Sequence, residues 1–200
     1  KRMLGGMSLF LSLRNVFLRN PGSREARERV SSFLEPFLAG HLPDLGDSLG
    51  WVNFLDRPVR LCAMVPQRGE PGGGPFWISG LEGRRVLISV EACEISPREE
   101  QQNLLRQSTH FNPVDMICSM RDAWGRPYDL TRFRDDRSWM KSVKRDDSGR
   151  EIQILELPGL WNGGMSHWLS LFVAVPETVF APVKSILDLL RPEHQPGRRL

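Results

Sequence analysis

A glycine-rich stretch between two apolar runs is the first place where this sequence could bind a ligand. It reads Arg68-Gly69-Glu70-Pro71-Gly72-Gly73-Gly74-Pro75-Phe76-Trp77. Prolines and glycines placed so close together exclude a helix and predict a loop. Successive glycines let the backbone approach a ligand and let neighbouring N–H groups form an anion-binding concavity, with the Glu70 carboxylate at its rim. A turn that only connects two strands is an equally good interpretation of this stretch alone.

Three further polar features interrupt or end apolar runs. Glu91 follows the strand-like run 86–90, and open α/β sheets bind ligands at the carboxyl ends of their strands. Lys184 precedes Ser185 at a predicted strand-to-helix turn, where a lysine and helix N–H groups can meet a phosphate. The third feature gathers hydrogen-bonding side chains before another strand-like run, and it reads Ser108-Thr109-His110-Phe111-Asn112-Pro113-Val114-Asp115.

Each of these residues also has a structural interpretation, which the sequence leaves open. Glu91 could pair with a surface arginine, Asn112 and Asp115 could cap a turn, and Lys184 could be solvated. His110 is the histidine best placed for binding, with a structural hydrogen bond as its alternative. The sequence shows no Cys/His metal-binding spacing and no Ser-His-Asp arrangement, so it predicts no metal site in this chain.

Composition indicates one globular domain, or a large part of one, with 40% apolar and 26% charged residues among 200. The net charge of +3 suits an anionic small molecule. The arginines are scattered without an interleaved aromatic stripe, so no nucleic-acid partner is expected. Cys62, Cys93 and Cys118 lie in apolar runs, which predicts buried, reduced thiols and a cytoplasmic location. The chain begins at Lys1 rather than Met, so we expect it to be a piece of a longer protein.

Hydrophobic periodicity predicts helices first and mixed structure afterwards. An amphipathic helix, too short to span a membrane, ends near residues 20–22; Ser23 caps a second helix, which Pro36 kinks. A loop follows at 40–50. Strands are predicted at 59–65, 86–90, 116–120 and 171–175, with helices at 97–107 and 186–190. The predicted fold class is therefore α/β, divided into a helical segment 1–56 that packs on a missing upstream half, a sheet-rich region 57–190 with an insertion 123–150 (a hairpin or lid), and a tail 191–200.

Several runs closely resemble a bacterial family known only as domain of unknown function 4301. The resemblance extends from Met3 to Gln195. It is carried by residues 69–76 and 109–115, by Glu156-Leu157-Pro158-Gly159-Leu160-Trp161-Asn162-Gly163 and by Arg191-Pro192-Glu193-His194-Gln195.

A more remote resemblance, over 86–190, is to the later half of the eukaryotic-type UDP-sugar pyrophosphorylases. The run 87–96 resembles their strand that ends in a sugar-binding glutamate, 111–115 resembles their Phe-Asn-x-x-Asn motif, and 175–190 resembles their closing segment with its phosphate-contacting lysine. This resemblance implies a GT-A-like nucleotide-diphospho-sugar transferase fold. It also implies a sugar-side region that joins a sugar 1-phosphate to a nucleoside triphosphate, with a Mg²⁺ whose ligands lie outside this chain.

Carried over by position, the resemblance gives Glu91 the sugar hydroxyls and Lys184 the phosphate charge. Asp115 departs from the pattern because an asparagine stands at that place in the pyrophosphorylases, and a carboxylate accepts hydrogen bonds but cannot donate them. The nucleotide-binding loop lies in an earlier half of those enzymes, so this chain by itself is expected to be inactive. The alternatives are a non-catalytic domain that binds a sugar or nucleotide and a purely structural domain.

Overall fold

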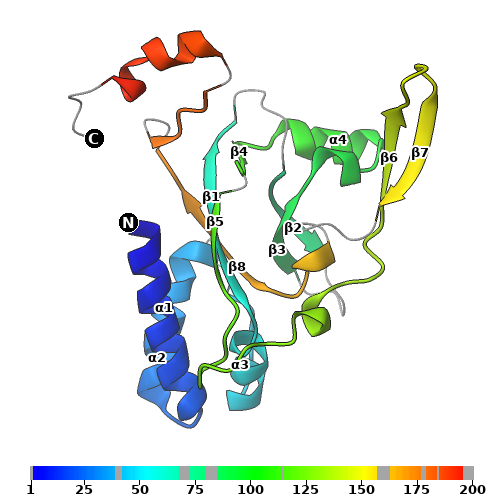
Figure 1. Cartoon of the computed structure of the whole chain (residues 1–200). Helices are drawn as coiled ribbons and strands as arrows, with labels where there is room; N and C mark the ends of the chain where they lie inside the picture. The colour runs from blue at the N-terminus through cyan, green and yellow to red at the C-terminus, as the bar shows by residue number, and fades with distance from the viewer. Residues whose placement is uncertain are drawn as a thin grey trace.

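The computed structural model shows a mixed α/β fold in which three helices pack against one face of a small mixed sheet (Figure 1). It describes residues 2–38, 42–67, 73–79, 85–113, 115–156, 163–176, 179–183 and 185–195. The α/β class and the mixed sheet predicted from the sequence are confirmed. None of the described helices is long and apolar enough to cross a bilayer.

Helices and strands follow one another along the chain in the order that Figure 1 colours from blue to red. The helical elements, with 3-10 helices labelled η, are α1 (Arg2–Arg19), α2 (Arg24–Leu34), η1 (Glu35–Leu38), α3 (Ser48–Leu55), η3 (Ala92–Glu94), α4 (Glu99–Arg106), η4 (Leu130–Phe133), η7 (Ile186–Leu190) and η8 (Pro192–His194). The strands are β1 (Val59–Pro66), β2 (Gly74–Ser79), β3 (Arg85–Val90), β4 (His110–Phe111), β5 (Met116–Ser119), β6 (Met140–Arg145), β7 (Glu151–Glu156) and β8 (Leu169–Ala174).

The first helix ends, and the second begins, close to where the sequence predicts. The Ser23 side chain caps α2 by accepting a hydrogen bond from the Ala26 N–H at 3.1 Å. Because proline lacks an N–H and clashes with the preceding turn, α2 gives way to the 3-10 helix η1 just before Pro36. The predicted loop 40–50 is wrong at its end, since α3 already begins at Ser48. Its cap is Asp47, which accepts from the Gly50 N–H at 3.0 Å, a signal that the surrounding glycines obscured.

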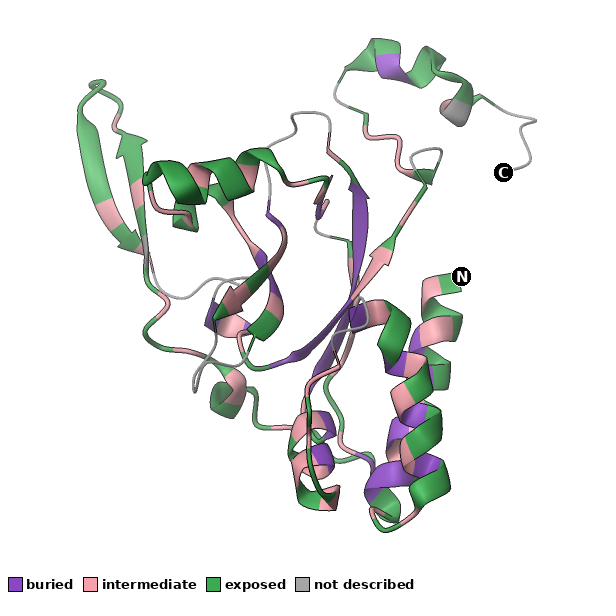
Figure 2. Cartoon of the chain, turned by 180° about the vertical axis from the view of Figure 1, so that it is seen from behind, coloured by how far each residue is buried: buried purple, intermediate pink, exposed green. Residues whose placement is uncertain are grey.

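Strand β1 is the centre of the fold. It pairs with β4 and β5 in antiparallel orientation and with β8 in parallel orientation. All of its residues are buried except Pro66, as expected for a strand covered on both faces. Val59 and Leu61 join the core beneath α1, α2 and α3, whereas Cys62 and Met64 join a smaller cluster on the opposite face. Figure 2 shows this buried band running along β1 and the inner sides of the helices.

Part of the apolar surface of α1 is buried within this chain. Met7, Phe10, Phe17 and Leu18 lie in the core that α1 shares with α2 and α3. Other apolar residues of the same helix, Leu4, Leu9 and Val16, are exposed. The boundaries 1–56, 57–190 and 191–200, and packing of the first segment on an upstream half, stay predictions.

Two β-hairpins stand beside the sheet. One is β2–β3, and it corrects the sequence analysis: the glycine-rich stretch is not a loop throughout, because Gly74 to Trp77 already belong to β2. Pro75 is tolerated there because β3 is the only partner of β2 among the described strands, which leaves β2 with an edge that needs no donor. The other is β6–β7, whose turn includes Gly149 at φ 82°. A hairpin in this region was one of the two predicted forms, and Figure 1 shows it projecting from the body.

The cysteines follow the prediction only in part. Cys62, Cys93 and Cys118 are all free thiols, which confirms that they form no disulfide with one another. Cys62 is buried, Cys118 is half-buried and Cys93 is exposed. Burial of Cys93 was therefore a wrong prediction, because the apolar run ends with β3 and Cys93 lies in the following turn of 3-10 helix, η3.

Candidate functional site: the carboxyl ends of β1 and β8

The predicted site residues that the structure describes gather where the parallel strands β1 and β8 end. The Asn112 N–H donates to the carbonyl of Gly73 at 2.7 Å, which joins the 110–115 run to the glycine stretch. The carbonyl of Asp115 accepts from the Ala63 N–H at 2.9 Å, which joins the same run to β1. His110 lies opposite Pro66 in the β1–β4 ladder. Three segments distant in sequence therefore meet at one end of the sheet.

The β2–β3 hairpin brings Glu91 to the same place. Gly74 pairs with Val90 in this hairpin, so Glu91 directly follows the residue opposite Gly74. Glu91 is half-buried, and its carboxylate lies 3.7 Å from the Cys93 sulfur, which donates a weak hydrogen bond to it. Its backbone N–H donates to the Glu94 carboxylate at 2.7 Å. Burial, followed by the Glu91 carboxylate, raises the pKa of the Cys93 thiol.

Asn112 is the most firmly held of these residues. Its side chain is only 3% exposed, and its Nδ2 donates to the carbonyl of Ala63 at 2.8 Å. Together with the backbone bond to Gly73, this makes Asn112 a link between β1 and the glycine stretch. The structural interpretation of Asn112 therefore has direct support, in a role that differs from capping a turn.

Close packing explains why glycine occupies positions 73 and 74. A Cβ on Gly73 would lie 2.9 Å from Ser89 Oγ and 3.2 Å from the carbonyl oxygen of Val90. A Cβ on Gly74 would lie 3.0 Å from the carbonyl oxygen of His110. A Cβ at either position would force its neighbours to shift, so packing by itself accounts for these glycines.

Ser89 is a site residue that the sequence analysis missed. Its side chain is fully buried beside Gly73, and its hydroxyl has no hydrogen-bond partner among the described residues. Buried hydroxyl groups in proteins are ordinarily hydrogen-bonded. The sequence did hold a signal for this residue, because Ser89 is a polar residue inside the apolar run 86–90.

Asp115 and His110 lie at the outer side of the cluster. Asp115 is exposed, while His110 is half-buried with its Nδ1 2.9 Å from the Thr109 hydroxyl. Both side chains therefore remain accessible at the end of the sheet. Hydrogen-bond acceptors on Glu91 and Asp115 suit a hydroxyl-rich ligand.

The segment that leads towards Lys184 also runs beside this cluster. The Val175 N–H donates to the carbonyl of Met64 at 2.7 Å, and the Phe180 ring packs edge-on against Phe111 with centroids 5.8 Å apart. Lys184, Glu70 and Gly72 lie outside the described residues, so their predicted roles stay predictions.

The turn that follows Lys184 holds a carboxylate of its own. The Ser185 N–H donates to the Asp188 carboxylate at 2.7 Å, and the Ser185 hydroxyl donates to the same oxygen at 3.2 Å. The helix that follows, η7, is a five-residue 3-10 helix. Its first turn is therefore capped from within the chain and carries a carboxylate.

Metal ligation has no evident place in the described part of the chain. No group of three or more His, Cys, Asp or Glu side chains there could hold a metal ion. The Mg²⁺ implied by the pyrophosphorylase resemblance, with ligands outside this chain, stays a prediction.

Comparison with known families identifies the chain. The model of a domain of unknown function, DUF4301, matches residues 45–195. The chain belongs to the DUF4301 family. The match includes every residue of the cluster described above. No curated protein matches the sequence.

Solved structures similar to this DUF4301 chain include UDP-glucose pyrophosphorylases from Leishmania major. Two variants of that enzyme, each in complex with UDP-glucose, are 18% and 16% identical to the chain, and both superpose with a TM-score of 0.40. A study of its open and closed structures gives 14% identity and a TM-score of 0.36. Each comparison covers 72% of this chain and 33% of the pyrophosphorylase. The chain thus spans about a third of the length of these enzymes.

Proposed function

We propose that the cluster at the carboxyl ends of β1 and β8 binds the sugar of a sugar 1-phosphate or nucleotide sugar. In this proposal the chain is the sugar-side part of a nucleotidyltransferase. The observation that carries it is that backbone hydrogen bonds and strand pairing join the three separate segments that contain Gly73, Glu91 and Asp115. They meet where α/β sheets commonly bind ligands.

The chemistry of the cluster suits sugar recognition. The Glu91 and Asp115 carboxylates accept hydrogen bonds from hydroxyl groups. A carboxylate at Asp115 instead of an amide favours ligands that present hydroxyl donors to this position.

The reaction in this proposal is attack of a sugar 1-phosphate oxygen on the α-phosphorus of a nucleoside triphosphate, which releases pyrophosphate. Lys184 would stabilise the negative charge on the phosphate groups during the transfer. Enzymes of this kind act mainly by positioning their substrates and stabilising charge. The nucleotide side of the reaction would come from outside this chain.

A structural role is the second candidate, and specific contacts favour it. Asn112 is held by Ala63 and Gly73, and the carboxylates of Glu91 and Glu94 bind groups within their own turn. If these polar groups serve only the fold, removing the charge of Glu91 should leave the affinity of the protein for sugar phosphates and nucleotide sugars unchanged.

A pyrophosphate-release assay separates these candidates. The longer protein that we expect to contain this chain is supplied with a panel of nucleoside triphosphates and sugar 1-phosphates. The account predicts release with at least one pair, and a strong reduction for Lys184→Ala. Lys141→Ala, an exposed lysine on β6, should leave the rate unchanged. Absence of release with every pair would remove the transferase proposal and leave sugar binding to be tested by itself.

A further inference from the structure

A cavity lies at the opposite end of the sheet from the cluster at the carboxyl ends of β1 and β8. Its volume is about 330 Å³, within the range of sites for small organic ligands. In the β2–β3 register, Ser79 pairs with Arg85 at the cavity end, whereas Gly74 pairs with Val90 at the site end. In the β1–β8 register, the cavity residue Leu169 pairs with Val59, the first residue of β1. The two sites therefore share no lining residue and can be tested separately.

Three parts of the fold build the walls of the cavity. The helical layer contributes one wall, the β2–β3 hairpin the second, and the start of β8 the third. Most of the lining is apolar or aromatic, with a few polar groups: Leu38, Pro43, Leu45, Gly50, Asn53, Phe54, Arg57, Trp77, Arg85, Val86, Leu87, Trp168, Leu169 and Ser170. Three of the lining residues, Phe54, Trp77 and Trp168, are aromatic, a composition that suits a planar ligand.

The charges in this lining all have one sign. Arg57 and Arg85 line the cavity, and none of its lining residues is acidic. The Arg57 guanidinium donates to the carbonyl oxygens of Asn53 at 2.6 Å and His167 at 3.4 Å, and lies 5.7 Å from the Phe54 ring centroid. Among the described residues no carboxylate forms an ion pair with Arg57 or Arg85. A cation held among carbonyls and aromatic rings can balance the charge of an anion.

Two buried N–H groups of this lining also lack partners in the described part of the chain. Trp168 is 6% exposed, and its indole N–H makes no hydrogen bond. The Nε of Arg57 is likewise buried and unpaired. Buried donors normally have acceptors. Both N–H groups have almost no water-accessible surface, so they do not reach the cavity themselves; the two arginines and the absence of an acidic residue in the lining are what favour an anionic ligand.

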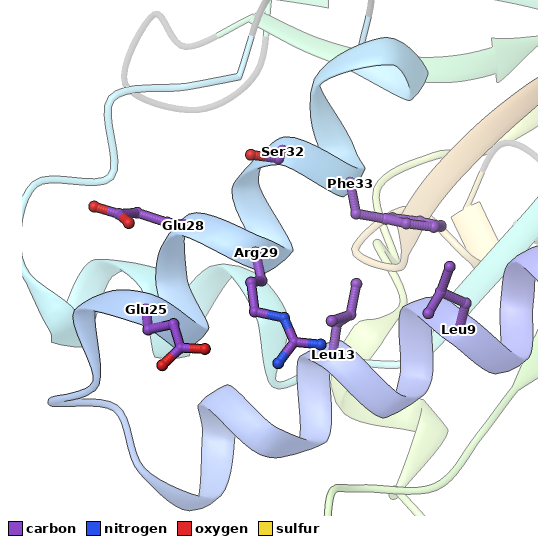
Figure 3. A pocket seen from close by; sticks show the side chains of 7 residues that line it. All are labelled: Leu9, Leu13, Glu25, Glu28, Arg29, Ser32 and Phe33. Atoms are coloured by element: carbon purple, nitrogen blue, oxygen red, sulfur yellow. The ribbon is translucent and has the colours of Figure 1, made fainter.

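A second hollow shows the contrast. A shallow trough of about 510 Å³ lies between α1 and α2, and Figure 3 shows Leu9, Leu13 and Phe33 along it. Its rim carries Glu25 and Glu28 as well as Arg29, so its charges have both signs and favour no single ligand charge.

We infer that the 330 Å³ cavity binds a small organic anion with a planar apolar body, such as an aryl carboxylate. The apolar body packs between the indole rings of Trp77 and Trp168, and the anionic group is bound by Arg57 and Arg85. This site is independent of the sugar site, and loss of one leaves the other intact.

Indole signals in a ¹H–¹⁵N NMR spectrum test this inference on the whole chain. The chain has six tryptophans, and Trp168→Phe identifies the signal of the Trp168 indole N–H. Naphthalene-1-carboxylate is titrated as the anionic probe, with the neutral naphthalene-1-carboxamide as its match. We expect the carboxylate to shift the Trp168 signal saturably and to bind several-fold more tightly than the carboxamide.

Arginine variants complete the test. Arg85→Ala removes an exposed side chain that makes no hydrogen bond to any described residue, so it should fold normally and weaken carboxylate binding about three- to fivefold. Arg57→Gln should weaken it about tenfold or more, since a hydrogen bond to a charged group is lost. Arg98→Ala, an exposed arginine outside the lining, serves as the control. No shift of the Trp168 signal, equal affinities of the two probes, or unchanged affinity in both variants overturns the inference.

Discussion

Replacing Asn112 by alanine tests whether this residue holds the glycine stretch against β1. The substitution removes a buried hydrogen bond of 2.8 Å and leaves the Ala63 carbonyl without that donor. A typical buried hydrogen bond contributes about 0.5–1.5 kcal/mol, and a buried group left unsatisfied costs about 1–3 kcal/mol. The expected loss in the free energy of unfolding is therefore about 2 kcal/mol. Urea denaturation followed by circular dichroism measures it.

The same position offers a pH test. In Asn112→Asp the new carboxyl group keeps the shape of the amide, but its charged form cannot donate to the Ala63 carbonyl. Burial should raise the pKa of this carboxyl in the folded state above its unfolded value. The variant's stability relative to wild type is then greatest below the unfolded pKa, about 3.9, and is lost as the pH rises through the folded pKa.

A matched control and a clear refutation complete this prediction. Asn53→Ala changes an exposed side chain on α3 and should alter stability by no more than about 0.5 kcal/mol. If Asn112→Ala costs no more than this control, Asn112 does not anchor the glycine stretch, and the packing argument for the site fails.

Further predictions concern close packing, thiol reactivity and one carboxylate. Gly73→Ala should destabilise the chain by about 1–3 kcal/mol, because the added Cβ would lie 2.9 Å from Ser89 Oγ. Gly5→Ala, in open space on α1, should instead stabilise the chain by about 0.5–1 kcal/mol. The reverse order of the two variants in denaturation curves would contradict this. Under native conditions N-ethylmaleimide should label exposed Cys93 before Cys62, because burial hides Cys62 and raises its pKa to about 12; equal rates by mass spectrometry would refute the difference. The Ser148 hydroxyl, 2.6 Å away, holds the pKa of Asp146 in the folded chain below 3.8. The ionised Asp146 carboxylate therefore stabilises the β6–β7 turn above pH 3.8, and this stabilisation is lost as the pH falls through the lower folded pKa. An NMR titration midpoint of Asp146 at or above 3.8 would contradict this prediction.

Local signals predicted α1, α2 and α4 and the strands β1, β3, β5 and β8, but not α3. The stop at residues 20–22, the Ser23 cap and Pro36 act within a few residues, so they can be read without the fold. The unbroken apolar run of β1 likewise indicated a strand covered on both faces. The glycine stretch misled for a related reason: β2 begins inside it, and strand pairing with β3 decides its conformation despite poor local β-propensity.

The site residues were found by type, but their surroundings depend on distant segments. That Asn112 would bind the carbonyl of Ala63, 49 positions earlier, follows only from the pairing of β1 with β4 and β5. Ser89 escaped notice because a serine in an apolar strand carries no local sign that its hydroxyl lacks a partner among the residues that the structure describes. The exposed position of Cys93 depends on where β3 ends, a boundary that apolar residues around the cysteine obscured.

Calorimetric titration with UDP-glucose and with glucose 1-phosphate tests the sugar-site proposal most directly. It uses the longer protein expected to contain this chain, as wild type, Glu91→Gln and the control Glu99→Gln on the exposed surface of α4. The account predicts binding by wild type and control, and a loss of about 1.5–3 kcal/mol in Glu91→Gln because hydrogen bonds to a charged group are removed. Equal affinities of Glu91→Gln and wild type would contradict the account.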